Sequence, residues 1–175
     1  MKRKAESLSF SEMSTDNLGV YLMDVQQPYL QKTLATFILC SKTISNSDNK
    51  EESKIIGDIL IKLGKLIQKH FDEDERIFFP YLRLKIENTN STKLSEFHIS
   101  FKEIKLKHQA ILKLFKKLRQ VSNNYTPASE TSATIKLSYA QLFNFEQDIL
   151  KHIFLEEEIL FPRLLQMDKL KNHNL

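Results

Sequence analysis

One short pattern occurs twice in the chain and places a histidine and a carboxylate in an otherwise apolar stretch. The copies begin at His70 and His152, 82 positions apart, and Asp74 or Glu156 follows four residues later. Both copies also share a Glu, an Ile, a Phe-Pro pair and a Leu, at 75, 77, 79–80 and 82 and at 157, 159, 161–162 and 164. Residues four apart lie on one face of an α-helix. Each copy therefore predicts a helix whose apolar face carries a His–carboxylate pair.

The remaining sequence also repeats apolar residues at helical spacing. Apolar residues make up 41% of the chain, and only 3 Gly and 4 Pro occur, which is typical of an all-helical protein. Polar breaks predict helices at about 16–44, 50–79 or beyond, 93–121 and 128–166. We expect an all-α, up-down-up-down four-helix bundle at 15–168, with a flexible lead-in at 1–14 and a frayed tail at 169–175.

The apolar stripes of these helices should face one another in the core. Gln27 precedes His70 by 43 residues and His108 precedes His152 by 44, so the first two helices repeat the spacing of the last two. Four acidic residues beside the motif, Glu73, Glu75, Glu157 and Glu158, are off the stripes and are expected in solvent. Glu73, three residues after His70, is the fallback ligand if its helix is rotated slightly. The predicted core positions are Val20, Gln27, Leu30, Leu34, Phe37, Ile44, Ile56, Ile59, Leu63, Ile67, His70, Asp74, Ile77, Phe101, Ile104, His108, Ile111, Phe115, Leu118, Leu142, Phe145, Ile149, His152, Glu156 and Ile159.

The polar residues on these stripes predict a metal site. Nitrogen and oxygen donors without thiolates suit iron, manganese or zinc. A buried carboxylate without a partner is costly, and two of them favour a shared cation. Because a carboxylate can bridge two ions, a di-metal site is predicted, with di-iron favoured; a metal-free hydrogen-bond network is the alternative. The candidate metal-ligating residues are His70, Asp74, His108, His152 and Glu156.

Charge and composition exclude several classes of function. The net charge of +4 comes without the sequence pattern of a known nucleic-acid reader, so no nucleic-acid partner is expected. No stretch approaches the roughly 20 apolar residues of a membrane span. Cys40 is the only cysteine, and the basic N-terminus lacks the apolar run of a signal peptide, which predicts a cytoplasmic protein. No catalytic triad or phosphate-binding loop occurs, so a non-enzymatic metal-binding protein is favoured; the oligomeric state is open.

With these residues in place, the chain resembles the hemerythrin-like (HHE cation-binding) family, and within it the iron–sulfur cluster repair di-iron proteins. The resemblance covers about residues 20–165 and is carried by His70–Pro80, His108–Arg119, Asn123–Pro127 and Leu142–Pro162. It implies a non-haem di-iron centre with three imidazole ligands, His70, His108 and His152, and two bridging carboxylates, Asp74 and Glu156. It also implies iron–sulfur cluster repair or a response to nitrosative and oxidative stress. Damaged iron–sulfur proteins, oxygen or nitric oxide would be the partners.

Two positions depart from the family pattern. Gln26-Gln27 occupies the place of a histidine in the first helix, and Asp74 replaces the usual Glu. A degenerate site that binds one iron or none is therefore an alternative to the di-iron centre. For function, the alternatives are a sensor or carrier that binds oxygen or nitric oxide reversibly, and a metal-free helical interaction module.

Overall fold

The computed structural model describes residues 10–46, 51–87 and 100–172. In these ranges the chain is helical and contains no strand, which confirms the predicted all-α class. Three helical runs contain a π-helical segment, labelled η, between two α-helices, and the remaining long run is α7. The segments are α2 (Thr15–Tyr21), η1 (Leu22–Gln26), α3 (Gln27–Ser45), α4 (Glu51–Glu73), η2 (Asp74–Phe78), α5 (Phe79–Ile86), α7 (Phe101–Val121), α8 (Ala133–Phe154), η3 (Leu155–Leu160) and α9 (Phe161–Asn172).

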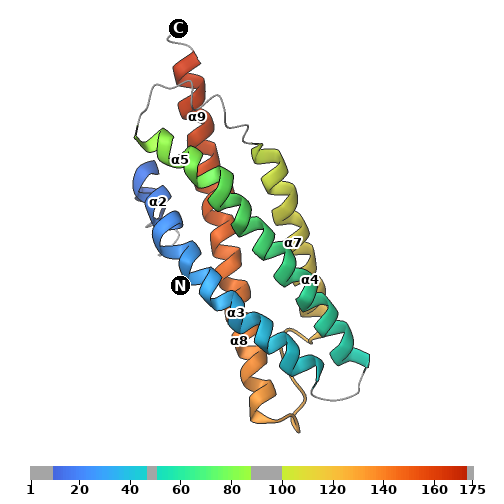
Figure 1. Cartoon of the computed structure of the whole chain (residues 1–175). Helices are drawn as coiled ribbons and strands as arrows, with labels where there is room; N and C mark the ends of the chain where they lie inside the picture. Colours follow the sequence, from blue (N-terminus) through green and yellow to red (C-terminus); the bar gives the residue numbers. More distant parts are fainter. Residues whose placement is uncertain (1–9, 47–50, 88–99, 173–175) are drawn as a thin grey trace.

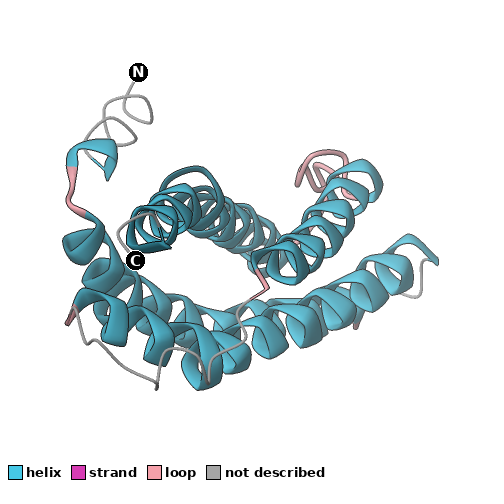
Figure 2. Ribbon diagram, turned by 90° about the horizontal axis from the view of Figure 1, so that it is seen from above, coloured by secondary structure: helices cyan, strands magenta, loops and turns pink. Residues whose placement is uncertain are grey.

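The long helical runs lie side by side and alternate in direction along the chain (Figure 1). Helix α3 packs against both α4 and α8, and α4 also packs against α7. Figure 2 shows the same helices from above, and the part of the chain that it describes contains only helices and loops. Among the described residues, no helix is long and apolar enough to cross a membrane. The predicted domain limits at 15 and 168 stay a prediction.

A proline follows each π segment at the second position of the next α-helix: Pro28, Pro80 or Pro162. Proline lacks the backbone N–H, and its ring clashes with the carbonyl four residues earlier. A π turn pairs residues five apart and so adds one residue to the helical turn. The N–H of Phe79 accordingly donates to the carbonyl of Asp74. We attribute the unbroken passage of each run through its proline to this wider turn.

The π segments also explain two errors in the predicted core. Val20 is 45% exposed, whereas Leu18 and Leu22 are fully buried. Ile77 is only partly buried, and the buried residue is Phe78. A regular period of 3.6 residues predicts that Val20 and Ile77 face the core. The extra residue of each π turn rotates that face to the neighbouring positions.

Serine side chains fix the starts of three helices. Ser14 caps α2, Ser100 caps α7 and Ser132 caps α8, each by accepting a hydrogen bond from the N–H three residues later. The predicted start at 128 is therefore wrong, because α8 begins at Ala133 after the Ser132 cap. The predicted start at 93 lies outside the described residues. So do Asp48, which the sequence predicts as a helix cap, and His98 and His173, two histidines that we expect outside the metal site.

The core consists of two apolar clusters separated by a polar layer. The first fills the space between α3, α4, α7 and α8 and includes Phe71 and Ile153. The second joins α2, η2, α5, η3 and α9 and includes Phe78 and Leu155. In the run α4–η2–α5 and in the run α8–η3–α9, the candidate ligands lie between the residues of the first cluster and those of the second. A buried polar layer of this kind needs partners for its charges.

Candidate metal centre

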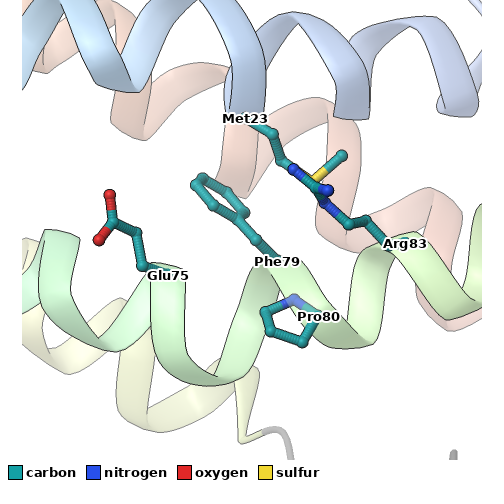
Figure 3. A pocket seen from close by; sticks show the side chains of 5 residues that line it. All are labelled: Met23, Glu75, Phe79, Pro80 and Arg83. Carbon is teal, nitrogen blue, oxygen red and sulfur yellow. The ribbon is translucent and has the colours of Figure 1, made fainter.

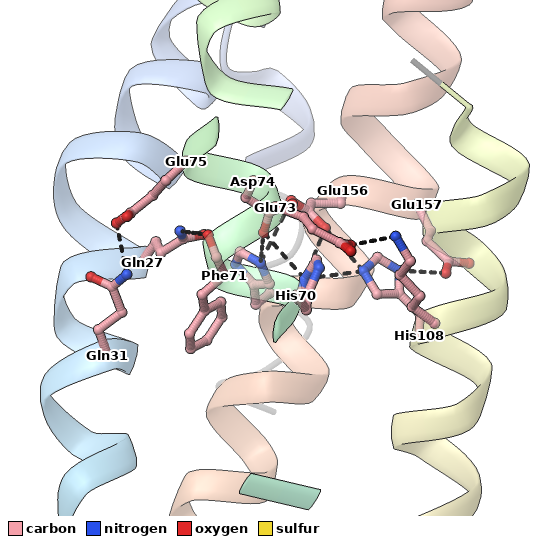
Figure 4. Close-up of polar contacts among 12 residues, drawn as sticks. Gln27, Gln31, His70, Phe71, Glu73, Asp74, Glu75, His108, Glu156 and Glu157 are labelled. Atoms are coloured by element: carbon pink, nitrogen blue, oxygen red, sulfur yellow. Dashed lines mark hydrogen bonds and ion pairs between the residues drawn. The ribbon is translucent and has the colours of Figure 1, made fainter. Parts of the chain in front are cut away.

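The structure brings the five candidate residues together in that polar layer. His70 lies in the last turn of α4 and Asp74 begins η2, while His152 and Glu156 span the junction of α8 and η3. His108 comes from the middle of α7. All five side chains are buried, with exposures between 0% and 3%. Figure 4 shows the resulting network of contacts between α4–η2, α7 and η3.

Four of these residues could hold one cation between them. One donor atom from each of His70, Asp74, His152 and Glu156 lies within 4.8 Å of the others. The Nε2 of His70 is 3.3 Å from Asp74 Oδ2 and 3.7 Å from Glu156 Oε2. The Nε2 of His152 is 3.5 Å from Glu156 Oε1 and 3.9 Å from Asp74 Oδ2. The two motif copies therefore meet as one cluster.

His108 contacts both motif copies. Its Nε2 is 3.2 Å from the Nε2 of His70 and 3.2 Å from Glu156 Oε2. Its Nδ1 is 2.7 Å from Glu157 Oε1. Because a carboxylate can only accept here, we assign the proton to Nδ1, which leaves the Nε2 lone pair directed at the cluster. The prediction that Glu157 is in solvent is wrong: its side chain is 19% exposed and it holds His108.

Glu73 and Glu75 each have a partner on another helix. Glu73 forms an ion pair with Lys107 of α7. The exposed Glu75 accepts a hydrogen bond of 2.7 Å from the amide of Gln31 on α3. Spacing along one helix gives no signal for such contacts, because the partners belong to different helices.

Gln27 occupies the corner opposite His108 in the network (Figure 4). It is 1% exposed, and its Nε2 donates a 3.2 Å hydrogen bond to the backbone carbonyl of Phe71, the residue after His70. Gln27 therefore lies beside the His70–Asp74 pair, as the 43-residue spacing predicts, but it contacts the backbone next to His70. Its amide is used as a backbone donor, and its Oε1 has no hydrogen-bond partner among the described residues.

Burial keeps two of the imidazoles neutral. It is the largest cause that lowers the pKa of His70, to about 3, against the opposing charge of Glu156. Burial likewise lowers the pKa of His152. For His108, burial is outweighed by the contacts with Glu156 and Glu157, and its pKa is raised. Neutral imidazole is the form that binds metal ions.

The pKa values of the two carboxyl groups shift in opposite directions. Burial, followed by the charge of Glu156, raises the pKa of Asp74 well above its ordinary value. Burial also acts to raise the pKa of Glu156, but the surrounding imidazoles outweigh it and lower the pKa to about 2. Two carboxylates in one buried site repel each other, so a cation between them would favour the ionised form of both.

Unpaired polar atoms at the cluster fit a bound cation. Among the described residues, no hydrogen-bond partner reaches Asp74 Oδ2, either ring nitrogen of His152 or either carboxylate oxygen of Glu156. Buried polar atoms are almost always paired, and an ion pair without further bonds does not offset desolvation. The donor set of imidazole nitrogens and carboxylate oxygens suits iron, manganese or zinc. The residues present therefore fit a transition-metal ion.

A cavity of about 400 Å³ lies outside this network. Figure 3 shows that it is lined by Met23, Glu75, Phe79, Pro80 and Arg83. None of the five candidate residues lines it, and its Glu and Arg offer opposite charges. The cavity is therefore separate from the candidate metal centre.

Comparison with known proteins agrees with this arrangement. The family model described as Hemerythrin HHE cation binding domain matches residues 18–164. Among curated relatives, the chain is 26% identical over 120 residues to the iron–sulfur cluster repair protein YtfE of Citrobacter koseri and 27% identical over 120 residues to that of Escherichia coli O81. Each match covers 69% of this chain and 51% of the relative, so the chain spans about half the length of these relatives. With the family match extending over most of its length, the chain belongs to the hemerythrin HHE cation-binding domain family.

Proposed function

We propose that this chain binds iron through His70, Asp74, His108, His152 and Glu156 and acts in iron–sulfur cluster repair or in the response to nitrosative and oxidative stress. The observation that carries the proposal is the buried set of imidazole and carboxylate donors within 4.8 Å of one another, several of which have no hydrogen-bond partner among the described residues. The names of the curated relatives support the repair role. We also propose that the alternating helical runs form the up-down-up-down bundle predicted from the sequence, in a cytoplasmic protein.

The distances between donors favour a single ion. Donors about 2.1 Å from one metal lie about 3.0–3.4 Å apart when adjacent and about 4.2 Å apart when opposite. The contacting pairs given above span 3.2 to 3.9 Å, and the donors of His70, Asp74, His152 and Glu156 all lie within 4.8 Å of one another. Two ions about 3.5–4 Å apart would place outer donors up to about 7–8 Å apart. The cluster therefore needs only small shifts to surround one ion, and large ones to surround two.

Charge also favours one divalent ion. The carboxylates of Asp74 and Glu156 balance one dication, whereas a second would leave excess positive charge in a buried layer. On the Gln27 side, the amide nitrogen already donates to the Phe71 carbonyl, and no histidine of the described residues fills that corner. We therefore propose one iron per chain in place of the di-iron centre implied by the resemblance.

Each protein group has a distinct role in this account. His70 and His152 present neutral nitrogens because they are buried, and Glu157 orients His108. Asp74 and Glu156 supply the negative charge, and the apolar clusters on either side exclude water. A bound iron would supply an open coordination position for a small oxidant, or the iron itself for transfer to a damaged cluster.

Metal loading of a matched pair of variants tests this proposal. We expect the metal-free wild type, incubated with ferrous iron without oxygen, to retain about one iron per chain after desalting. His152→Ala should retain none. Ser138→Ala, which changes a buried polar residue earlier on α8, should match the wild type. Absence of retained iron in the wild type would contradict the proposal and favour the metal-free interaction module.

Reversible binding of oxygen or nitric oxide is the second candidate function. It is favoured by the apolar walls of the site: the ring of Phe161 stacks 6.4 Å from that of His108, and Phe71 meets His152 edge-on at 5.8 Å. A dry site of this kind protects a bound diatomic molecule from water. An absorption band that appears with oxygen and disappears under argon would favour binding. Transfer of iron to a cluster-free iron–sulfur protein would favour repair.

A further inference from the structure

A small cavity between η2 and the start of α7 reaches the candidate metal centre. Its volume is about 60 Å³, and Asp74 is part of its wall. Asp74 is 1% exposed, and its Oδ2 has no hydrogen-bond partner among the described residues. A water occupies about 30 Å³ in the liquid, so the cavity has room for about two waters or for a partly hydrated cation. Asp74 therefore belongs both to the wall of the cavity and to the candidate metal centre, where its Oδ2 is 3.3 Å from His70 Nε2.

The wall of the cavity is acidic and partly exposed to solvent. Glu73, Asp74 and Glu103 contribute three carboxyl groups, and Lys107 contributes one ammonium. Glu103 is exposed, while the side chains of Glu73 and Lys107 are 21% and 37% exposed. Lys107 pairs with Glu73 across the gap between α4 and α7. A cleft lined by excess charge of one sign attracts the opposite ion and raises its rate of arrival.

We propose that this cavity is the access route by which a divalent cation reaches Asp74, and that the Lys107–Glu73 ion pair closes it. The inference rests on the metal site proposed above. An arriving cation meets Glu103 first, then takes the place of the Lys107 ammonium at Glu73, and passes to the carboxylate of Asp74. No covalent bond of the protein is made or broken. The cation exchanges water ligands for carboxylate oxygens, and the Lys107 ammonium moves into solvent.

The cavity of Figure 3 provides the contrast within the same molecule. It is larger, but it reaches none of the five candidate residues, and Arg83 offsets Glu75 on its wall. Glu75 follows Asp74 directly in the chain, yet it bonds to Gln31 on α3. A Glu75 variant therefore changes the charge near the site by the same amount as a Glu73 variant without touching the proposed route.

The rate of cobalt uptake by the metal-free full chain tests the route. Cobalt(II) is followed by its visible absorption after rapid mixing. We expect Lys107→Met to speed uptake, and Glu73→Gln and the exposed Glu103→Gln to slow it, by roughly tenfold if electrostatic guidance dominates. Glu75→Gln and the exposed Lys102→Met should match the wild type. The cobalt bound at equilibrium should be the same in all of them.

The double variant Lys107→Met with Glu73→Gln separates closure from charge. It keeps the net charge of the wall but removes the ion pair, so uptake faster than the wild type supports closure by that pair. Unchanged rates in all the cavity variants, with normal final cobalt, would overturn the route while the metal site stands. A wild type that binds no cobalt at equilibrium would overturn both the metal site and its route.

Discussion

The two corners of the polar layer, at His108 and at Gln27, differ in what the neighbouring helix contributes. At one corner, α7 supplies an imidazole whose Nε2 is 3.2 Å from both His70 and Glu156, and Glu157 holds its other nitrogen. At the other, α3 supplies an amide that donates to the carbonyl of Phe71. His108 therefore offers a metal ligand, whereas Gln27 stabilises the helix backbone next to His70. A repeated sequence motif can therefore produce one shared site in place of two equal half-sites.

Replacing His108 or Gln27 should give the largest difference in metal-dependent stability. We expect His108→Ala to lose the stabilisation that bound metal provides, because a ligand is gone, and Gln27→Ala to keep it. At a free metal concentration 100 times the dissociation constant, that stabilisation is about 2.7 kcal/mol. Urea unfolding with and without cobalt measures it. Equal metal-dependent stabilisation in the two variants would show that the corners do not differ.

The equivalent glutamates of the two motif copies should also separate. Glu157 orients His108, whereas Glu75 bonds to Gln31. Loss of a group that orients a ligand typically weakens metal affinity 10- to 100-fold. We expect that loss for Glu157→Gln and no change for Glu75→Gln, measured by competition with a chelator of known affinity. A similar loss in both variants would point to general electrostatics as the cause.

Acid should destabilise the metal-free protein through His70. Its pKa is about 3 in the folded chain against an ordinary 6.5, so below pH 6.5 the unfolded chain takes up a proton that the folded chain does not. Folding stability supplied by neutral His70 is therefore lost as the pH falls, by about 2 kcal/mol at pH 5. The raised pKa values of His108 and Asp74 act in the opposite direction.

A variant isolates the contribution of His70 from these opposing groups. Between pH 7 and pH 5, the wild type should lose about 2 kcal/mol more than His70→Gln. Urea unfolding of both metal-free proteins at the two pH values provides the comparison. If the two proteins respond equally to pH, burial of His70 does not disfavour its charged form.

The smallest effect is expected at the Phe71 carbonyl. Gln27→Met keeps the size of the side chain but removes the donor to the Phe71 carbonyl. We expect a loss of about 0.5–1.5 kcal/mol in unfolding free energy, with no change in bound metal. Chemical denaturation and elemental analysis measure the two quantities. Loss of metal in this variant would make Gln27 a ligand.

The sequence was sufficient to predict the all-α class and to select five residues that the structure places together, because a four-residue spacing fixes a shared helix face. It was not sufficient where a π turn rotates the face, as at Val20 and Ile77. The prolines at 28, 80 and 162 were the available signal for these turns. The role of Glu157 was missed because its partner lies on another helix, and the start of α8 was misplaced because Ser132 caps it.

The number of metal ions per chain tests the central claim most directly. The purified chain is loaded with ferrous iron under argon, desalted, and assayed for iron and protein by elemental and amino-acid analysis. One shared site at His70, Asp74, His108, His152 and Glu156 predicts about one iron per chain. Two irons per chain would contradict the single-ion account, and none would contradict the metal site itself.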